Sequence, residues 1–213
     1  MTTPSQYVDQ LQWRYACKKF DATAQLSSDE VTALREALHL SPLSLGLQLW
    51  HFIEVDTPEV RQRLKEVSWN QSQISDASKL FVFCVRRDVT EADLDKHIAE
   101  MVKVRGGSAE ALEPYKQRMG SLIFSKNDTE RQAWLERQVY IALGFLMSAA
   151  SNLGIDTCAI EGMEPDKYDT ILGLQESPYR TLCALAVGHR SADDAYAAQL
   201  KVRYPLDEVL THL

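Results

Sequence analysis

The sequence has few residues of the kinds that bind metals or form disulfides. It contains 4 Cys and 5 His in 213 residues, and no CxxC pair or HExxH motif is present. These spacings favour neither a zinc site nor a disulfide framework. We therefore predict no metal site and four free thiols, at Cys17, Cys84, Cys158 and Cys183.

Long apolar runs and an excess of basic residues are also missing. No apolar run approaches the ~18–20 residues that span a bilayer, and the opening MTTPSQYVDQ lacks the regions of a signal peptide. The net charge is −7, whereas a general nucleic-acid binder needs a basic face. We expect a cytoplasmic protein that binds neither membranes nor nucleic acids. This charge still allows a local basic pocket for a phosphate.

The familiar catalytic motifs are absent as well. The sequence has no GxGxxG after a strand, no Walker A motif and no GxSxG. A Cys/His nucleophile pair remains open, although no local context supports one. If the protein is an enzyme, we expect an organic cofactor to supply the chemistry.

What is present is the composition of a globular protein, 45% apolar and 25% charged. No repeat or linker divides the chain, so we predict one domain over residues 1–213. Apolar periodicity predicts helices over 5–15 and 58–67, and another that Ser27 and Glu30 cap. Apolar and β-branched runs predict strands over 51–55, 79–85, 156–160 and 181–187. Strands interleaved with helices indicate an α/β or α+β protein.

Two helical regions stand out between the predicted strands. Residues 90–122 are helical and highly charged, with a break at Gly106–Gly107, and predict two helices that leave the main core. Asn127 and Glu130 form a capping box that opens the longest helix, which Gly154 ends. Its second half is apolar almost all round, which predicts burial on every side, within a domain or at an obligate subunit interface.

Three short segments could carry chemistry. Residues 14–21 (RYACKKFD) hold three cations that could bind an anion such as phosphate, or simply complement a helix C-terminus. Residues 159–163 (AIEGM) place a Gly turn after a strand, where a flat ligand could approach the backbone, although such turns are common. Residues 201–205 (KVRYP) put two cations on one side of an extended segment, which could also be a solvated tail.

These three segments occur in one chain together with two more that lie between them, residues 40–52 (LSPLSLGLQLWHF) and 70–78 (NQSQISDAS). Together they resemble the FMN-dependent nitroreductase family, and within it the oxygen-insensitive NAD(P)H nitroreductases and the flavin reductases of luminous bacteria. The resemblance extends from Arg14 to Pro205. It implies an α+β fold with a central, mainly antiparallel sheet flanked by helices, in an intertwined homodimer with two interfacial FMN sites.

The resemblance also implies roles for individual residues. Arg14, Lys201 and Arg203 would bind the FMN phosphate, and Lys18 the pyrimidine edge of the flavin. A segment reaching in from the partner chain, and a turn whose backbone faces flavin N5, would complete the site. The implied cofactor-binding residues are Arg14, Tyr15, Ala16, Lys18, Pro42, Leu43, Ser44, Gly46, Gln48, Asn70, Gln73, Ile160, Glu161, Gly162, Lys201 and Arg203.

Several positions depart from the family pattern. Leu43 replaces a Ser, Gly46 an Asn and Leu49 a Pro in the partner-chain segment, Ala16 replaces a Ser, and Gln73 stands where relatives often have Lys. Each departure removes a hydrogen bond or charge worth about 1 kcal/mol. The region 90–124 corresponds to the family's substrate lid, where Arg105, Gly106 and Phe124 are candidate substrate contacts.

The function implied by the resemblance is ping-pong hydride transfer from NADH or NADPH through flavin N5 to nitroaromatics, quinones or free flavin, with no catalytic side chain. The departures keep two alternatives open. One is a flavin-binding or storage protein with little turnover, and the other is an interaction protein of the same fold that has lost FMN.

Overall fold

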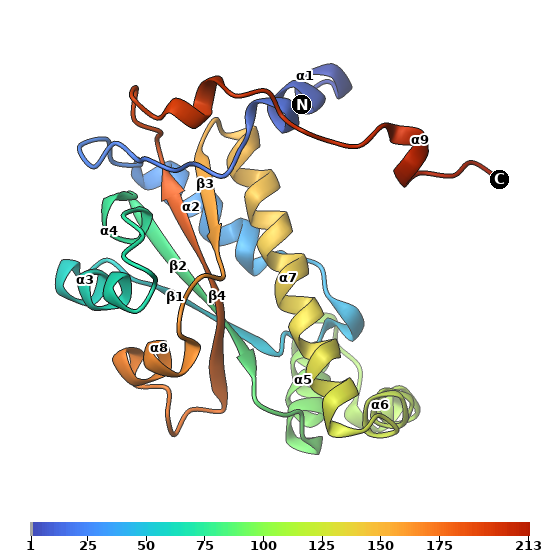
Figure 1. The fold of residues 1–213 in the computed structure, drawn as a ribbon. Coiled ribbons are helices and arrows are strands. Elements are labelled where there is room, and N and C mark those ends of the chain that lie inside the picture. The colour runs from blue at the N-terminus through green and yellow to red at the C-terminus, as the bar shows by residue number, and fades with distance from the viewer. Residues whose placement is uncertain (1) are drawn as a thin grey trace.

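The computed structural model describes residues 2–213, and its centre is a four-stranded antiparallel sheet. The strands are β1 (Trp50–Glu54), β2 (Lys79–Arg86), β3 (Asp156–Ile160) and β4 (Tyr179–Gly188). Their order is β1-β2-β4-β3, so β1 and β3 are the edge strands, and helices cover both faces (Figure 1). The prediction of an α+β fold with an antiparallel sheet is confirmed.

The two faces of the sheet form two separate apolar cores. Side chains of a strand alternate between faces, so Phe81, Phe83 and Val85 of β2 lie in one core. Leu80, Val82 and Cys84 lie in the other. Both faces are buried, which explains why β2 is a continuous apolar run in the sequence.

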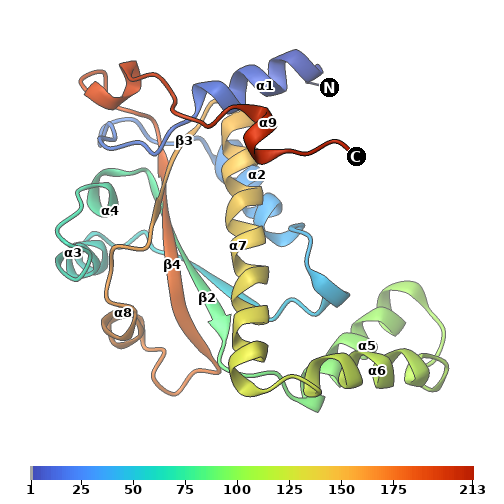
Figure 2. The same cartoon turned by 45° about the vertical axis from the view of Figure 1, so that its right-hand side comes forward.

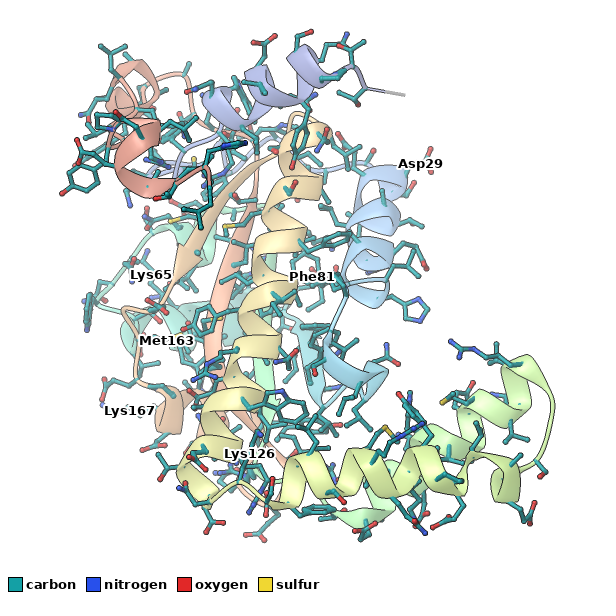
Figure 3. All side chains as sticks on the ribbon, turned by 90° about the vertical axis from the view of Figure 1, so that its right-hand side faces the viewer. Asp29, Lys65, Phe81, Lys126, Met163 and Lys167 are labelled. Carbon is teal, nitrogen blue, oxygen red and sulfur yellow. The ribbon has the colours of Figure 1, made fainter. Side chains whose placement is uncertain are left out.

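Helices α2 (Ser28–His39) and α7 (Asp128–Asn152) cover the first face, and Phe81 lies between them (Figure 3). Helices α3 (Pro58–Glu66), α4 (Gln73–Asp76) and α8 (Pro165–Leu172) cover the second face. The capping boxes expected at Ser27 and Asn127 are both present. Helices α4 and α8 are absent from the sequence-based assignment.

Helix α7 is only partly buried in the single chain. Leu135, Val139 and Leu146 pack onto the sheet, whereas Tyr140, Ile141 and Phe145 are exposed by 39%, 44% and 42%. The expectation that the second half is buried on every side is therefore wrong for one chain. The other possibility given for this helix, burial at an interface between subunits, is compatible with its exposed apolar side chains.

Helices α5 (Glu91–Arg105) and α6 (Ala109–Phe124) form a hairpin that projects from the lower end of α7 (Figure 2). The turn between them contains Gly106 and Gly107, with φ of 78° and 92°. Glycine adopts these angles without steric cost, which explains why the helical pattern breaks there. The inner side of α5 contributes Leu94, Ile98 and Met101 to the first core.

The two ends of the chain meet at the top of the molecule (Figure 1). Helix α1 (Pro4–Trp13) packs across the end of α7, where the hydroxyls of Tyr7 and Ser148 lie 3.0 Å apart. After β4 the chain forms a short 3-10 turn, η2 (Ala195–Ala198), and an extended tail that ends beyond α9 (Leu206–Val209). No helix among residues 2–213 is long and apolar enough to cross a membrane.

Candidate functional site

A basic pocket of about 550 Å³ lies between the end of α1 and the C-terminal tail. The tail reaches this point because the ammonium group of Lys201 donates a hydrogen bond to the backbone carbonyl of Arg14. The structure thus brings together residues nearly 190 positions apart in the sequence. Of the residues singled out in the sequence, Arg14, Tyr15, Ala16, Lys18, Lys201 and Arg203 line this pocket.

Four cations of the pocket have no carboxylate partner, whereas the fifth, Arg190, pairs with Asp156. Across the described part of the chain, none of Arg14, Lys18, Lys201 and Arg203 is in an ion pair. Burial and the neighbouring Arg203 lower the pKa of Arg14, and burial, Arg14 and Arg203 lower the pKa of Lys201. The buried Nε of Arg14 has no hydrogen-bond partner. An unneutralised cation cluster with an orphaned donor fits a bound anion.

Asp194 holds the segment that carries Arg14 and Lys18. Its Oδ2 accepts hydrogen bonds from the Tyr15 hydroxyl at 2.8 Å and from the backbone amides of Lys18 and Lys19 at 2.8 and 3.1 Å. Burial raises the pKa of Asp194, but these bonds and the one from the Tyr196 amide outweigh burial and lower it. The carboxylate therefore fixes the wall of the pocket without entering it.

An ion pair between Asp156 and Arg190 lies next to the pocket. Asp156, at the start of β3, is 3% exposed, and its Oδ1 accepts hydrogen bonds from Nε and Nη2 of Arg190 at 2.9 and 2.5 Å. The Arg190 guanidinium lies 4.1 Å from the centre of the Trp13 ring and 4.6 Å from that of Tyr15. These contacts tie the end of α1 to the sheet.

Strand β3 connects the basic pocket to the second predicted segment. Ala16 forms a parallel bridge with Thr157, near the start of the strand, and Ile160, Glu161 and Gly162 follow at its other end. Five residues of extended chain cover about 16 Å. The two segments thus lie at opposite ends of one edge strand. This arrangement suits an elongated ligand that binds one segment with each of its ends.

The turn after β3 packs against residues 68–71. The side-chain amide of Gln71 donates hydrogen bonds to the carbonyls of Gly162 at 2.8 Å and Ser68 at 3.1 Å. A Cβ on Gly162 would lie 2.6 Å from the Trp69 ring, so a larger residue at this position would displace that exposed ring. Asn70 is exposed beside this turn, with φ of 55°. The structure thus brings Asn70 to the Glu161–Gly162 turn.

Gln73 lies between these two groups. The residue is 8% exposed; burial raises the pKa of the Cys158 thiol, and the nearby Lys18 and Gln73 oppose that rise. Gln73, Cys158 and Lys18 are therefore near one another along β3. The position therefore carries a neutral amide beside the charge of Lys18.

Residues 42–48 lie elsewhere, and none of them lines the basic pocket. They pass between α7 and α5 (Figure 2), where the backbone amide of Ser44 donates to Oε1 of Gln138 at 2.9 Å. Leu43 packs against the first core, whereas Pro42 and Gln48 are exposed. Gly46 lies under the ring of His97. Within one chain, the structure does not bring this segment to the other site residues.

The three candidate substrate contacts are also separated. Arg105 and Gly106 lie at the tip of the α5–α6 hairpin, whereas Phe124 ends α6. A helix of 16 residues spans about 24 Å. Within one chain, the tip residues and Phe124 therefore cannot contact the same small molecule.

The four thiols are unsuited to nucleophilic catalysis. All four cysteines are free and buried. Burial, and next the charge of Asp156, raise the pKa of Cys17 to about 12, and burial raises those of Cys84 and Cys183 to about 12. At neutral pH these groups remain thiols.

Sequence reasoning missed several residues that shape the site. They are Asp156, Arg190, Asp194, Tyr140 and His97. Asp156 and Asp194 begin or precede regular elements, and nothing local distinguishes them from solvated acids. His97 interrupts the apolar inner stripe of α5 (Leu94, Ile98 and Met101), and that interruption is a signal the sequence does contain.

Comparison with known proteins identifies this arrangement. Residues 11–189 match the family model described as the nitroreductase family. The chain is 30% identical over 211 residues to the oxygen-insensitive NAD(P)H nitroreductase of Enterobacter cloacae, covering 93% of this chain and 95% of the relative. It is 28% identical over 220 residues to the major NAD(P)H-flavin oxidoreductase of Aliivibrio fischeri, covering 100% of both.

A solved structure shares the fold. A protein from Exiguobacterium sibiricum, described as a nitroreductase in complex with FMN, superposes with a TM-score of 0.81. The match covers 97% of each chain at 19% identity.

Proposed function

This chain belongs to the nitroreductase family, and from that premise we propose that it is an FMN-dependent NAD(P)H oxidoreductase acting on nitroaromatics, quinones or free flavin. The observation that carries the proposal is the basic pocket. Arg14, Lys201 and Arg203 lie together with no carboxylate to neutralise them, and the Arg14 Nε is buried without a partner. A phosphate ester supplies the acceptors that these donors lack.

The rest of the site fits the ring system of the cofactor. With the phosphate held by Arg14, strand β3 leads to Glu161 and Gly162 at its other end, where a flat ring would meet the backbone of the turn. We propose that Lys18, Gln73 and Asn70 hydrogen-bond the polar edge of the flavin. Ile160, Glu161 and Gly162 would present their backbone to its central ring.

FMN, when bound, accepts two electrons from NADH or NADPH and passes them to the second substrate. The chain's own residues hold and orient it. Lys18 places a positive charge beside the pyrimidine edge, which favours negative charge on that side of the ring. The buried thiols and the pocket cations take no part in proton transfer. Donor and acceptor would occupy the same face of the bound flavin in turn, which corresponds to ping-pong kinetics.

We propose that the active form is a homodimer. Tyr140, Ile141 and Phe145 form an exposed apolar stripe on α7, and α1 and the tail add Leu11, Trp13 and Tyr204 to the exposed apolar surface. Residues 42–48 do not reach the basic pocket of their own chain. A partner chain that supplies its own Ser44, Gly46 and Gln48 completes the site.

We also propose that the chain is one domain, residues 1–213, whose α5–α6 hairpin covers the substrate face. In the dimer, Phe124 from one hairpin could contact an acceptor without Arg105 and Gly106 of the same chain. The 24 Å estimated between the ends of α6 is then compatible with all three candidate contacts, because each of the two sites could receive residues from both hairpins.

The test begins with the absorbance spectrum of the purified protein and identification of the flavin that acid releases. Stoichiometric FMN, together with NADH or NADPH oxidation in the presence of a quinone or a nitroaromatic, supports the proposal. Bound FMN without turnover favours flavin storage instead. A protein that neither carries nor takes up FMN contradicts both.

A further inference from the structure

Residues 44–48 have a backbone that needs outside support. Leu45, Gly46 and Gln48 have φ of 61°, 73° and 49°. The left-handed region costs a non-glycine residue about 1–2 kcal/mol, so Leu45 and Gln48 adopt it only where neighbouring groups enforce it. The segment is held from one side by the hydrogen bond between Ser44 and Gln138 of α7.

His97 holds the segment from the other side. A Cβ built on Gly46 would lie 3.1 Å from Cε1 of the His97 ring and 3.5 Å from its Nε2. The imidazole therefore lies directly against the position of a Cβ at residue 46, and a side chain there would push the ring aside by a few tenths of an ångström. Among residues 2–213, none hydrogen-bonds the nitrogens of the His97 ring, so the contact with Gly46 is one of packing.

The position of His97 on its helix is unusual. Leu94, Ile98 and Met101 form the inner stripe of α5 and pack into the first core, and His97 is a half-buried polar residue on the same stripe. Burial and the charge of Arg105 lower its pKa, so the ring is neutral at pH 7. A neutral imidazole packs over a backbone without the cost of burying a charge.

We propose that His97 is a positioning residue for the cofactor site, because its ring takes the place of the side chain missing at Gly46 and holds residues 44–48 in their flavin-facing conformation. This inference rests on the proposed function. It also gives the hairpin a second role: α5 sets the shape of the segment that completes the partner's flavin site. The glycine at position 46, where the family pattern has Asn, is then compensated by the ring of His97 on α5.

The experiment is a pair of single variants and their combination, tested on the FMN-depleted dimer. His97→Ala removes the support, and we expect FMN affinity to fall about tenfold, the effect of one good contact. Gly46→Asn keeps the left-handed backbone, which Asn tolerates, but its side chain pushes against the His97 ring. We expect this single variant to bind FMN more weakly than wild type as well. In Gly46→Asn/His97→Ala the new side chain occupies the vacated space, and affinity returns to within about threefold of wild type.

Lys96→Ala is the matched control, since Lys96 is the exposed neighbour on the same helix. Each variant is titrated with FMN by flavin fluorescence, and kcat and KM for the acceptor are measured separately. A loosened segment raises KM more than it lowers kcat. His97→Ser, which also removes the ring, replaces His97→Ala if the latter does not fold by circular dichroism.

The outcomes separate the two proposals. Wild-type protein that binds no FMN overturns the proposed function, and the role of His97 with it. Wild-type protein that binds FMN, with His97→Ala binding equally well, overturns only the role of His97. A double variant as weak as the product of the two single losses also overturns it, because independent damage shows no compensation.

Discussion

The hydroxyl of Tyr140, on α7, donates a hydrogen bond to the carboxylate of Glu161, in the turn that follows β3. Burial and this carboxylate raise the pKa of Tyr140, so the phenol keeps its proton. The pair joins the exposed face of the longest helix to the turn that we propose faces the flavin. It therefore fixes the turn from outside the sheet.

Tyr140→Phe removes only that hydroxyl. We expect turnover to fall about three- to tenfold, because the turn is less well oriented, while stability changes by less than ~1 kcal/mol for a half-exposed pair. Steady-state kinetics with a quinone acceptor and urea unfolding provide the two measurements. Tyr7→Phe is the matched control, since Tyr7 is similarly exposed (40%) and its hydroxyl also bonds to α7. Equal turnover in both variants and wild type would contradict the role of the pair.

The proposed phosphate site predicts a selective loss in Lys201→Ala/Arg203→Ala. Each charge-assisted hydrogen bond is worth roughly 1.5–3 kcal/mol, so FMN affinity should fall at least ~100-fold. Titration with riboflavin, which lacks the phosphate, is the internal control and should change little. If the FMN titration curve of the double variant matched that of wild type, Lys201 and Arg203 would not bind the phosphate.

Asp194 predicts an acid dependence of stability. Its pKa is lowered in the folded chain from an ordinary value of 3.8, so its contribution is complete above that value and is lost as pH falls through the lower, folded-state pKa. Asp194→Asn turns an amide toward several N–H donors and should cost about 1–3 kcal/mol at pH 7. The difference from wild type should shrink below pH 3.8, as urea unfolding at pH 7 and pH 3.5 can check. A constant difference at both pH values would argue against this linkage.

The exposed stripe on α7 predicts a dimer that depends on Phe145. Phe145→Glu places a charge in the proposed interface and should weaken association by at least about 2 kcal/mol. Light scattering across a dilution series measures the shift to monomer, and FMN should be lost in parallel because residues 42–48 then come from no partner. Val104→Glu, at a 72% exposed position on α5, is the control and should remain dimeric. A wild-type monomer that holds FMN would contradict the two-chain site.

Local patterns predicted most of the fold, because they depend on residues close together in sequence. The capping boxes at Ser27 and Asn127 involve residues three apart, and both are present. Strand β3 has the predicted bounds, and β4 extends the predicted strand at each end. Helix α8 escaped notice because eight residues provide barely two turns of apolar periodicity.

The site was harder to predict, because its support is non-local. Basic residues at 14–18 and 201–203 were visible, but that Lys201 bonds the carbonyl of Arg14 depends on the path of the tail. Asp194 owes its role to three donors more than 170 positions away. The contact between His97 and Gly46 follows from how the hairpin packs, and no spacing in the sequence encodes it.

The basic pocket takes one wall from the beginning of the chain and the other from its end. A ligand bound there would link the two ends of the chain noncovalently and restrain about fifteen residues at each end. Since only the folded chain has this pocket, the resistance of the protein to proteases would increase with the concentration of flavin. The same three cations would then set both how tightly the cofactor is held and how long the protein lasts.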